Sequence, residues 1–412
     1  MLRDGEHGVL GGGQLGRQVV ATGAKFGTGV ARQPRVRVIA TGAAIVALIA
    51  GAGTYVLTRG GGTSANAPVS SGVTLPGPFR VVSMTPTPGT RRTDGSAPVQ
   101  VTFSAPVAPG SPRPSLTPSV PGSWQSGGDT LMFTPTVPFS QSTRVTVTIP
   151  AGRAGVRSAM GGLLARPMTA QFTTKPFSNL ALTDLLGQLG YLPGSLRPNL
   201  GTLVSTYDWT ESGLAGEVKR AYNPPPASIN WDQGYPGSLA ALWQPGSYNV
   251  VLRGAVMAFQ SQHNMTTNGD LTSAVWSALL KAASTGQNNV NGYTYAVASK
   301  GSPETLTIWH DGRKVMRTLA NTGIPSAPTV DGTFPVYERF VNTIMSGTNP
   351  DGSHYSDPVQ YVSYFNGGDA VHYFPRGAFG FQQSLGCVEL PYDQAKAAYP
   401  YLTYGSLVTV SG

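Results

Sequence analysis

Residues 382–391 read QQSLGCVELP and contain the single cysteine of a 412-residue chain. Gly386 directly precedes Cys387 and lets the backbone turn tightly, so that successive amide groups can point at one carbonyl oxygen. A thiol that acts as a nucleophile also needs a base. The nearest imidazole in the sequence is His372, at the end of an apolar run, and a strand followed by a returning loop would bring the two together. An isolated buried cysteine is more often inert than catalytic, so the interpretation depends on its surroundings.

Those surroundings have the residue pattern of a β-rich domain. Residues 291–412 contain runs in which apolar and polar side chains alternate, as on strands with one buried face. The tetrapeptide HDGR at 310–313 predicts a tight hairpin turn, because Asp-Gly favours such turns. Cys387 is therefore expected in a domain of strands and loops.

The order of motifs in this domain resembles that of a known family. His372 is followed by S-x-G-C-V-x-L-P at 384–391, by a short helical stretch at 392–399 and by a final GSLVTV strand. Upstream, VDGTFPVYERF at 330–340 looks like a P-x-G-x-F-x-V strand. The combination is similar to the catalytic domain of L,D-transpeptidases of the YkuD type.

The resemblance implies roles for individual residues. Cys387 corresponds to the nucleophile and His372 to the base, while Ser384 and Gly386 shape the loop that carries the thiol. Neither a metal ion nor an organic cofactor is implied. The implied reaction is acyl transfer between peptidoglycan stem peptides, with a tetrapeptide donor and a diamino-acid acceptor, which forms 3–3 cross-links. Carbapenem-type inhibitors are implied as ligands.

Two positions depart from the family pattern. Leu385 stands where the family usually has a second histidine, and Glu389 stands where it has arginine or asparagine. With Leu385, which we expect to be packed against apolar neighbours, the oxyanion must rely on backbone N–H groups, chiefly those of Gly386 and Cys387. Glu389 reverses a charge that could contact the substrate.

Further candidates for the substrate pocket come from the strands before His372. Tyr361 and Tyr364 are candidates for the pocket wall, with burial in the core as the alternative. His354 lies in a segment, 348–358, where the family carries a mobile lid, although a solvated loop position is the simpler interpretation.

Two other functions remain open from the sequence. An L,D-carboxypeptidase would use the same thioester and replace the acceptor amine by water. A non-catalytic peptidoglycan-binding envelope protein would use its helical domain and leave the C-terminal domain vestigial.

The N-terminal part predicts a membrane anchor. Residues 38–58 are uncharged and would span about 30 Å as a helix, which is close to the thickness of a bilayer core. Arginines are denser before than after this segment, which predicts a cytoplasmic tail at 1–37 and an extracytoplasmic remainder beginning with a Gly/Ser/Pro linker at 59–78. The alternative is a secreted protein whose signal peptide is cleaved after the small residues at 65–67.

Two modules separate the linker from the C-terminal domain. Residues 79–175 contain short alternating runs divided by turns, which predict an Ig-like β-sandwich without chemistry of its own. Residues 177–284 show helical periodicity and resemble a three-helix peptidoglycan-binding domain, interrupted by a Pro- and Trp-rich insertion at 194–249. The sequence therefore predicts a multidomain, mainly β protein with an N-terminal membrane helix, an Ig-like sandwich, a small helical domain and a β-rich catalytic domain at 291–412.

Composition agrees with such a protein. Charged residues make up only 11% of the chain, while Gly and Pro number 53 and 34, as turns and linkers require. The formal net charge is +9, but no Lys/Arg stripe is interleaved with aromatic residues, so nucleic acid is not an expected partner.

Overall fold

The computed structural model describes residues 78–198, 212–225 and 227–412. The tail at 1–37, the membrane segment at 38–58 and nearly all of the linker at 59–78 lie outside the described residues. Within the described ranges, no helix is both long and apolar enough to cross a bilayer.

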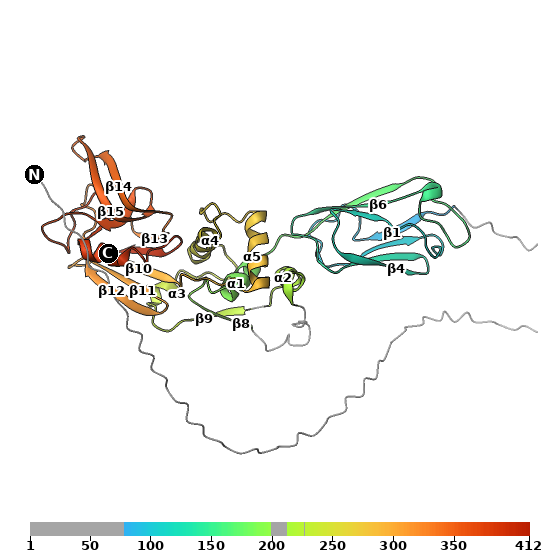
Figure 1. Cartoon of the computed structure of the whole chain (residues 1–412), viewed down its shortest axis with the longest axis horizontal. Helices are drawn as coiled ribbons and strands as arrows, with labels where there is room; N and C mark the ends of the chain where they lie inside the picture. Colours follow the sequence, from blue (N-terminus) through green and yellow to red (C-terminus); the bar gives the residue numbers. More distant parts are fainter. Residues whose placement is uncertain (1–77, 199–211, 226) are drawn as a thin grey trace, which may run out of the picture. The chain divides into compact units, whose positions relative to one another are not determined.

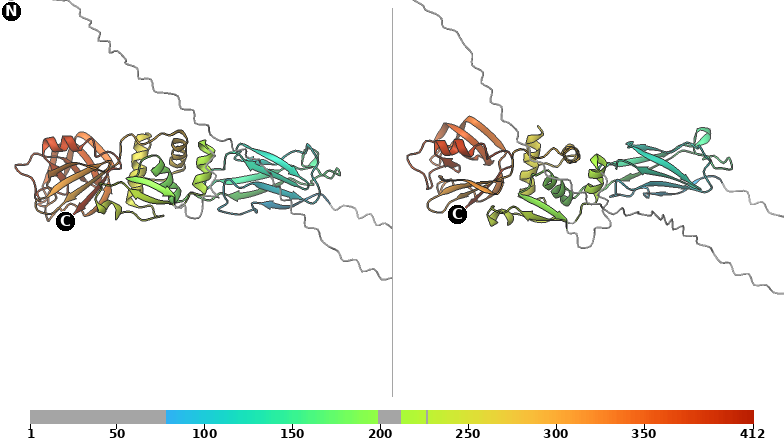
Figure 2. Two further views of the ribbon diagram at one scale, coloured as in Figure 1. Left: turned by 90° about the horizontal axis from the view of Figure 1, so that it is seen from below. Right: turned by 60° about the horizontal axis from the view of Figure 1, so that its bottom comes forward.

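The Ig-like domain consists of two antiparallel sheets that face each other (Figures 1 and 2). One sheet has the order β1-β2-β5-β4 and the other β3-β6-β7. The bounds are β1 Val81–Thr85, β2 Val99–Phe103, β3 Ser115–Thr117, β4 Gly122–Gly127, β5 Thr130–Pro135, β6 Arg144–Ile149 and β7 Met168–Thr173. A 3-10 turn, Gly152–Ala154, lies between β6 and β7. Alternate residues of β2 and β6, such as Val101 and Val147, are fully buried between the sheets. The alternation in the sequence therefore predicted these strands correctly.

The three helices expected from the periodicity are present in the helical domain. They are α1 Asn179–Gln188, α4 Val250–Gln262 and α5 Ser273–Thr285. Each begins after a polar residue whose side chain accepts a hydrogen bond from a backbone N–H of the first turn: Ser178, Asn249 and Thr272.

The insertion is part of this domain's folded core. It contributes β8 Gly194–Pro198, α2 Gly213–Tyr222, β9 Ala227–Trp231 and α3 Gly237–Ala240. Val218, Tyr222 and Leu239 of the insertion are buried in the same cluster as Leu186 of α1 and Leu279 of α5. The described part of the Pro- and Trp-rich sequence therefore completes the helical core.

The C-terminal domain, residues 291–412, is built on two sheets. The first has the order β12-β11-β10-β18-β13, with bounds β10 Thr294–Ser299, β11 Thr305–His310, β12 Arg313–Leu319, β13 Gly332–Pro335 and β18 Leu407–Ser411. The second has the order β14-β15-β16-β17, with bounds β14 Glu338–Thr348, β15 His354–Asn366, β16 Asp369–Tyr373 and β17 Val388–Leu390. A short helix, α6 Tyr392–Ala398, follows β17. The prediction of a mainly β, multidomain chain is confirmed for the described residues.

Apolar side chains from both sheets and from α6 form one buried cluster. Ile308 and Val408 come from the first sheet, Val371 and Val388 from the second, and Ala395 from α6. The turn between β11 and β12 is the HDGR sequence, with Asp311 and Gly312 at φ angles of 47° and 72°. Both positive angles are typical of a two-residue hairpin turn, as the sequence predicted.

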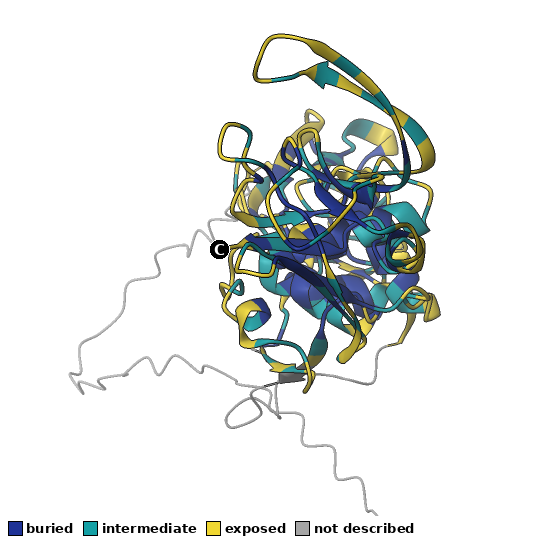
Figure 3. Ribbon diagram, turned by 90° about the vertical axis from the view of Figure 1, so that its left-hand side faces the viewer, coloured by how far each residue is buried: buried dark blue, intermediate teal, exposed yellow. Residues whose placement is uncertain are grey.

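The hairpin of β14 and β15 extends beyond this core. Most of its outer residues are exposed or only partly buried, and Figure 3 shows it standing clear of the buried part of the domain. The segment 348–358, where a lid was expected, forms the tip of this hairpin and the first part of β15.

Packing in the helical domain gives a stability prediction. Leu279 on α5 is fully buried, so Leu279→Ala should lower the free energy of unfolding by about 2–5 kcal/mol. Leu214 on α2 is 46% exposed, and Leu214→Ala should change it by no more than about 0.5 kcal/mol. Urea unfolding followed by circular dichroism measures both. Equal losses in the two variants would contradict the placement of Leu279 in the core.

Candidate active site

A cavity of about 680 Å³ opens beside the second sheet of the catalytic domain. Its walls come from the β14–β15 hairpin, from β16, and from the segment 374–387 that joins β16 to β17, which we call the Cys loop. The lining residues are Ile344, Met345, Ser346, Asn349, Tyr355, Asp357, Val359, Tyr364, Gly368, Asp369, His372, Phe374, Arg376, Gln383, Leu385, Cys387 and Glu389. The predicted nucleophile and base therefore share one cavity.

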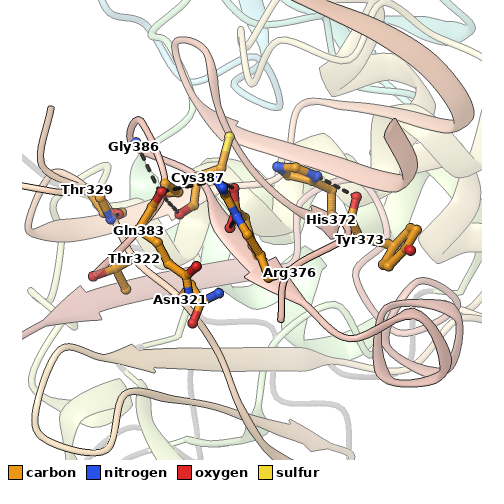
Figure 4. A network of polar contacts seen from close by, with 12 residues as sticks. Asn321, Thr322, Thr329, His372, Tyr373, Arg376, Gln383, Gly386 and Cys387 are labelled. Atoms are coloured by element: carbon orange, nitrogen blue, oxygen red, sulfur yellow. Dashed lines mark hydrogen bonds and ion pairs between the residues drawn. The ribbon is translucent and has the colours of Figure 1, made fainter. Parts of the chain in front are cut away.

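The pairing of β16 with β17 brings these two residues together. The strands are parallel, with Val371 opposite Val388 and His372 opposite Glu389. Side chains two residues apart on a strand point to the same face, so Cys387 and Glu389 face the cavity beside His372. Figure 4 shows the imidazole on β16 and the thiol at the residue before β17.

His372 is 2% exposed, and its orientation is set by one hydrogen bond. Its Nδ1 lies 2.9 Å from the backbone carbonyl of Tyr373, which can only accept, so Nδ1 carries a proton. In the neutral ring, Nε2 is then left with a lone pair, on the side of Cys387 (Figure 4). This tautomer is the one that a general base for the thiol requires.

Electrostatics keep both groups neutral in the resting protein. Burial raises the pKa of the Cys387 thiol to about 12. A hydrogen bond from the Ala370 N–H lowers this pKa, whereas the negative charges of Asp369 and Glu389 raise it further. Burial also lowers the pKa of His372, partly opposed by its bond to Tyr373 and by the charge of Glu389. The resting pair is therefore a neutral thiol and a neutral imidazole.

A hydrogen-bonded turn holds Cys387 in place. The Ser384 hydroxyl donates to the Cys387 carbonyl at 2.6 Å and accepts from the Gly386 N–H at 3.2 Å. Gly386 has a φ of +119°, a backbone angle that residues other than glycine rarely adopt. A Cβ at this position would also collide with the Asp369 carboxylate. Ser384 therefore shapes the loop through its two hydrogen bonds, and Gly386 does so through its positive φ.

This turn changes the expectation for the oxyanion donors. The Gly386 N–H is already bonded to Ser384 and does not point freely at a substrate. No described residue accepts a hydrogen bond from the Cys387 N–H, so this amide is the donor left for an oxyanion.

The chain before β13 supports the Cys loop from behind. Asn321 exchanges two backbone hydrogen bonds with Glu389, and the Thr322 carbonyl accepts from the N–H groups of Gln383 and Ser384. The buried carboxylate of Glu304 in turn accepts from the N–H and the hydroxyl of Thr322. Figure 4 shows part of this network. The position of Cys387 therefore depends on segments far apart in the sequence.

Glu389 has a partner that the sequence analysis missed. Arg376 of the Cys loop donates to both carboxylate oxygens of Glu389 at 2.8 Å, and also to the Gln383 carbonyl at 3.0 Å. Glu389 is buried, whereas the Arg376 side chain is 28% exposed and lines the cavity. The signal in the sequence was the reversed charge at position 389, which requires a cation if the carboxylate is buried.

The remaining candidates are divided between the cavity and other surroundings. Tyr364 lines the cavity, but Tyr361 does not, because its ring packs against Tyr392 and Tyr399. His354 is exposed on the hairpin, with Thr348 as its neighbour, and does not line the cavity.

Leu385 is 37% exposed at the edge of the cavity, so the expectation that it is packed among apolar neighbours is wrong. The described residues contain no group of three His, Cys, Asp or Glu side chains arranged to hold a metal ion.

Two family models match parts of this chain. Residues 293–410 match the family model of the L,D-transpeptidase catalytic domain, of the YkuD type, and residues 76–174 match the model of a bacterial Ig-like domain. The chain therefore carries an L,D-transpeptidase catalytic domain preceded by a bacterial Ig-like domain. The resemblance of the helical domain to a peptidoglycan-binding domain stays a prediction.

Similar solved structures are distant in sequence. An L,D-transpeptidase from Mycobacterium smegmatis is 14% identical over 81% of this chain and 100% of its own, with a TM-score of 0.28. L,D-transpeptidase 3 from Mycobacterium tuberculosis is 16% identical over 81% and 98%, with a TM-score of 0.27. The catalytic domain from the E. faecium L,D-transpeptidase is 26% identical over 28% and 95%, also at 0.27. A comparison with curated protein sequences found no match.

The turn before the thiol gives the second prediction. Gly386→Ala should cost about 1–3 kcal/mol of backbone strain, in addition to the collision with Asp369, and should displace the thiol. Gly377→Ala in the same loop is the matched control, because a Cβ there meets no atom within 4 Å. Melting temperature and the rate of Cys387 acylation measure both effects. A Gly386→Ala variant with unchanged stability and acylation would show that the turn is not constrained.

The third prediction concerns the charge state of the thiol. Because the pKa of Cys387 is raised to about 12, its alkylation by iodoacetamide should rise about tenfold per pH unit from pH ~7 to ~10 without levelling. A free cysteine peptide should level above pH ~9, since its thiol has a pKa of about 8.5. Mass spectrometry of the intact protein gives the rate. A plateau in the protein below pH ~9 would contradict the burial of a neutral thiol.

Proposed function

We propose that the protein is a cell-wall L,D-transpeptidase that forms 3–3 peptidoglycan cross-links through a cysteine acyl-enzyme. The observation that carries the proposal is the placement of Cys387 beside the Nε2 side of a neutral His372 within one cavity. The family of residues 293–410 supports the reaction class.

In the first half of the reaction, the Cys387 sulfur attacks the carbonyl carbon of the amide between the diamino acid and the terminal D-alanine. His372 Nε2 takes the thiol proton as the carbon–sulfur bond forms. The Cys387 N–H donates to the oxyanion. The imidazolium then protonates the D-alanine nitrogen, the amide bond breaks, and D-alanine leaves behind a thioester on Cys387.

In the second half, the side-chain amine of a neighbouring stem peptide attacks the thioester carbonyl. His372 takes a proton from this amine and returns it to the sulfur when the carbon–sulfur bond breaks. The new amide joins two diamino acids, and the thiol is restored. If water replaces the amine, the same steps give an L,D-carboxypeptidase, so product analysis separates the two activities.

The proposal includes the location of the enzyme. Residues 38–58 would anchor the chain in the membrane as a single-pass helix, with the catalytic domain outside the cell at the wall. The Ig-like domain would serve as a spacer, and the helical domain would contribute to binding of the wall.

The fourth prediction tests the chemistry of Cys387. Incubation with a carbapenem should add the mass of the opened inhibitor to the protein, because a strained lactam carbonyl acylates a thiol without losing a leaving group. Cys387→Ser should give no adduct and no transfer product, since a serine hydroxyl at its ordinary pKa is a far weaker nucleophile. Intact-protein mass spectrometry measures the adduct, and chromatography of cross-linked stem peptides measures transfer.

The base is tested in the same assays. His372→Ala should lower turnover by about 10²–10⁴-fold. His354→Ala is the control, because that imidazole is exposed and outside the cavity, and it should retain the wild-type rate. If the two alanine variants lose activity equally, His372 is not the base. If the folded wild-type protein forms neither adduct nor product, the protein is not an enzyme of this class.

A further inference from the structure

Arg376 presents unused hydrogen-bond donors to the cavity. A guanidinium group has five N–H donors, and the Nε and Nη2 nitrogens of Arg376 are bonded to Glu389 and to the Gln383 carbonyl. No described residue accepts a hydrogen bond from its Nη1. The Arg376 side chain is partly exposed where it lines the cavity. The group therefore keeps a charge and two N–H donors for a ligand.

The guanidinium is held firmly although it is reachable. Two hydrogen bonds of 2.8 Å join it to the buried Glu389, and its central carbon, Cζ, lies over the Phe374 ring, 4.6 Å from the ring centre. Hydrogen bonding to Glu389, and then the charge of that carboxylate, raise the pKa of Arg376 against the effect of burial, so the guanidinium stays protonated. The guanidinium is thus fixed in place, and its Nη1 N–H groups can donate charge-assisted hydrogen bonds to a second carboxylate.

Arg376 is the one place in the described cavity where an anion meets a positively charged side chain. Asp357, Asp369 and Glu389 line it together with Arg376, which is the single Lys or Arg among the described lining residues. A substrate carboxylate would be repelled by Asp357, Asp369 and Glu389, so the free Nη1 N–H groups of Arg376 are the cationic donors that can bind it.

The spacing fits a carboxylate one residue beyond the bond that breaks. Glu389 follows Cys387 by two residues, about 6.6 Å of extended backbone, and Arg376 is bonded to its carboxylate. A terminal residue spans about 3.5 Å, and a charge-assisted hydrogen bond adds about 2.8 Å. A peptide held at Cys387 by its last amide would thus bring its terminal carboxylate to the guanidinium.

We propose that Arg376 recognises the C-terminal carboxylate of the donor peptide and thereby restricts the enzyme to the amide before the terminal residue. This inference rests on the proposed function. In this proposal the negative charge at position 389 has a role, because Glu389 orients Arg376 and Arg376 binds the substrate. Arg376 is thus a specificity-determining residue, and Glu389 is a positioning residue.

The test compares two donors on the full-length protein: a tetrapeptide ending in D-alanine, and the same peptide ending in D-alaninamide. The wild-type protein should favour the free acid in kcat/KM by roughly 10- to 100-fold, the effect expected of a hydrogen bond between charged groups. Mass spectrometry of the released D-alanine or D-alaninamide gives both rates. Similar rates for the two donors would overturn the inference while leaving the proposed function intact. No turnover of either donor would overturn both.

The variants separate recognition from folding. Arg376→Gln combined with Glu389→Gln replaces the ion pair by two amides and leaves no unpaired buried charge. It should abolish the preference for the acid, whereas Arg313→Gln, an exposed arginine outside the cavity, should keep it. Arg376→Lys retains the charge but loses the paired geometry, and should reduce the preference several-fold. A double variant or a lysine variant with the wild-type preference would overturn the inference.

Discussion

The parallel pairing of β16 with β17 is the constraint on which the active site depends. It sets His372 opposite Glu389 and turns Cys387 toward the same cavity. A one-residue slip of this register would point the thiol to the other face, because successive side chains on a strand alternate. The register is secured on one side by the apolar contact of Val371 and Val388 in the core, and on the other by the backbone bonds between Asn321 and Glu389. The chemistry therefore rests on the packing of the whole catalytic domain.

Burial gives this site its electrostatic character. A nucleophilic cysteine is often activated as a thiolate beside a cation, but here burial and the carboxylates of Asp369 and Glu389 hold Cys387 in its neutral form. In the proposed reaction, the neutral His372, oriented through Tyr373, takes the thiol proton as the sulfur attacks a carbonyl. Such a resting thiol is shielded from oxidation and from unspecific electrophiles, because these react with the thiolate. The cost is that the reaction depends on how well the substrate fits the cavity.

The two departures from the family pattern have different structural meanings. Glu389 is a buried charge, and a buried charge needs a partner with good geometry; Arg376 supplies it through two hydrogen bonds. The substitution therefore moves the positive charge from the strand to the Cys loop, where it faces the substrate. Leu385 is not paired with another described residue in this way. It is exposed at the cavity edge, and the donor that remains for the oxyanion is the Cys387 N–H.

The sequence by itself determined the strands and helices, and it identified Cys387 and His372 as the candidate pair that the structure places in one cavity. Alternation with one buried face identified β2 and β6, the helical stripe identified α1, α4 and α5, and the motif around Cys387 pointed to His372. These features depend on residues that are close together in the chain, either as a periodic pattern or as a short motif. Only the tertiary structure decided that Tyr361 packs outside the cavity, that the Gly386 N–H is bonded to Ser384, and that Arg376 meets Glu389. The physical reason is that such contacts depend on the path of the Cys loop, which is set by backbone hydrogen bonds to a segment far away in the sequence.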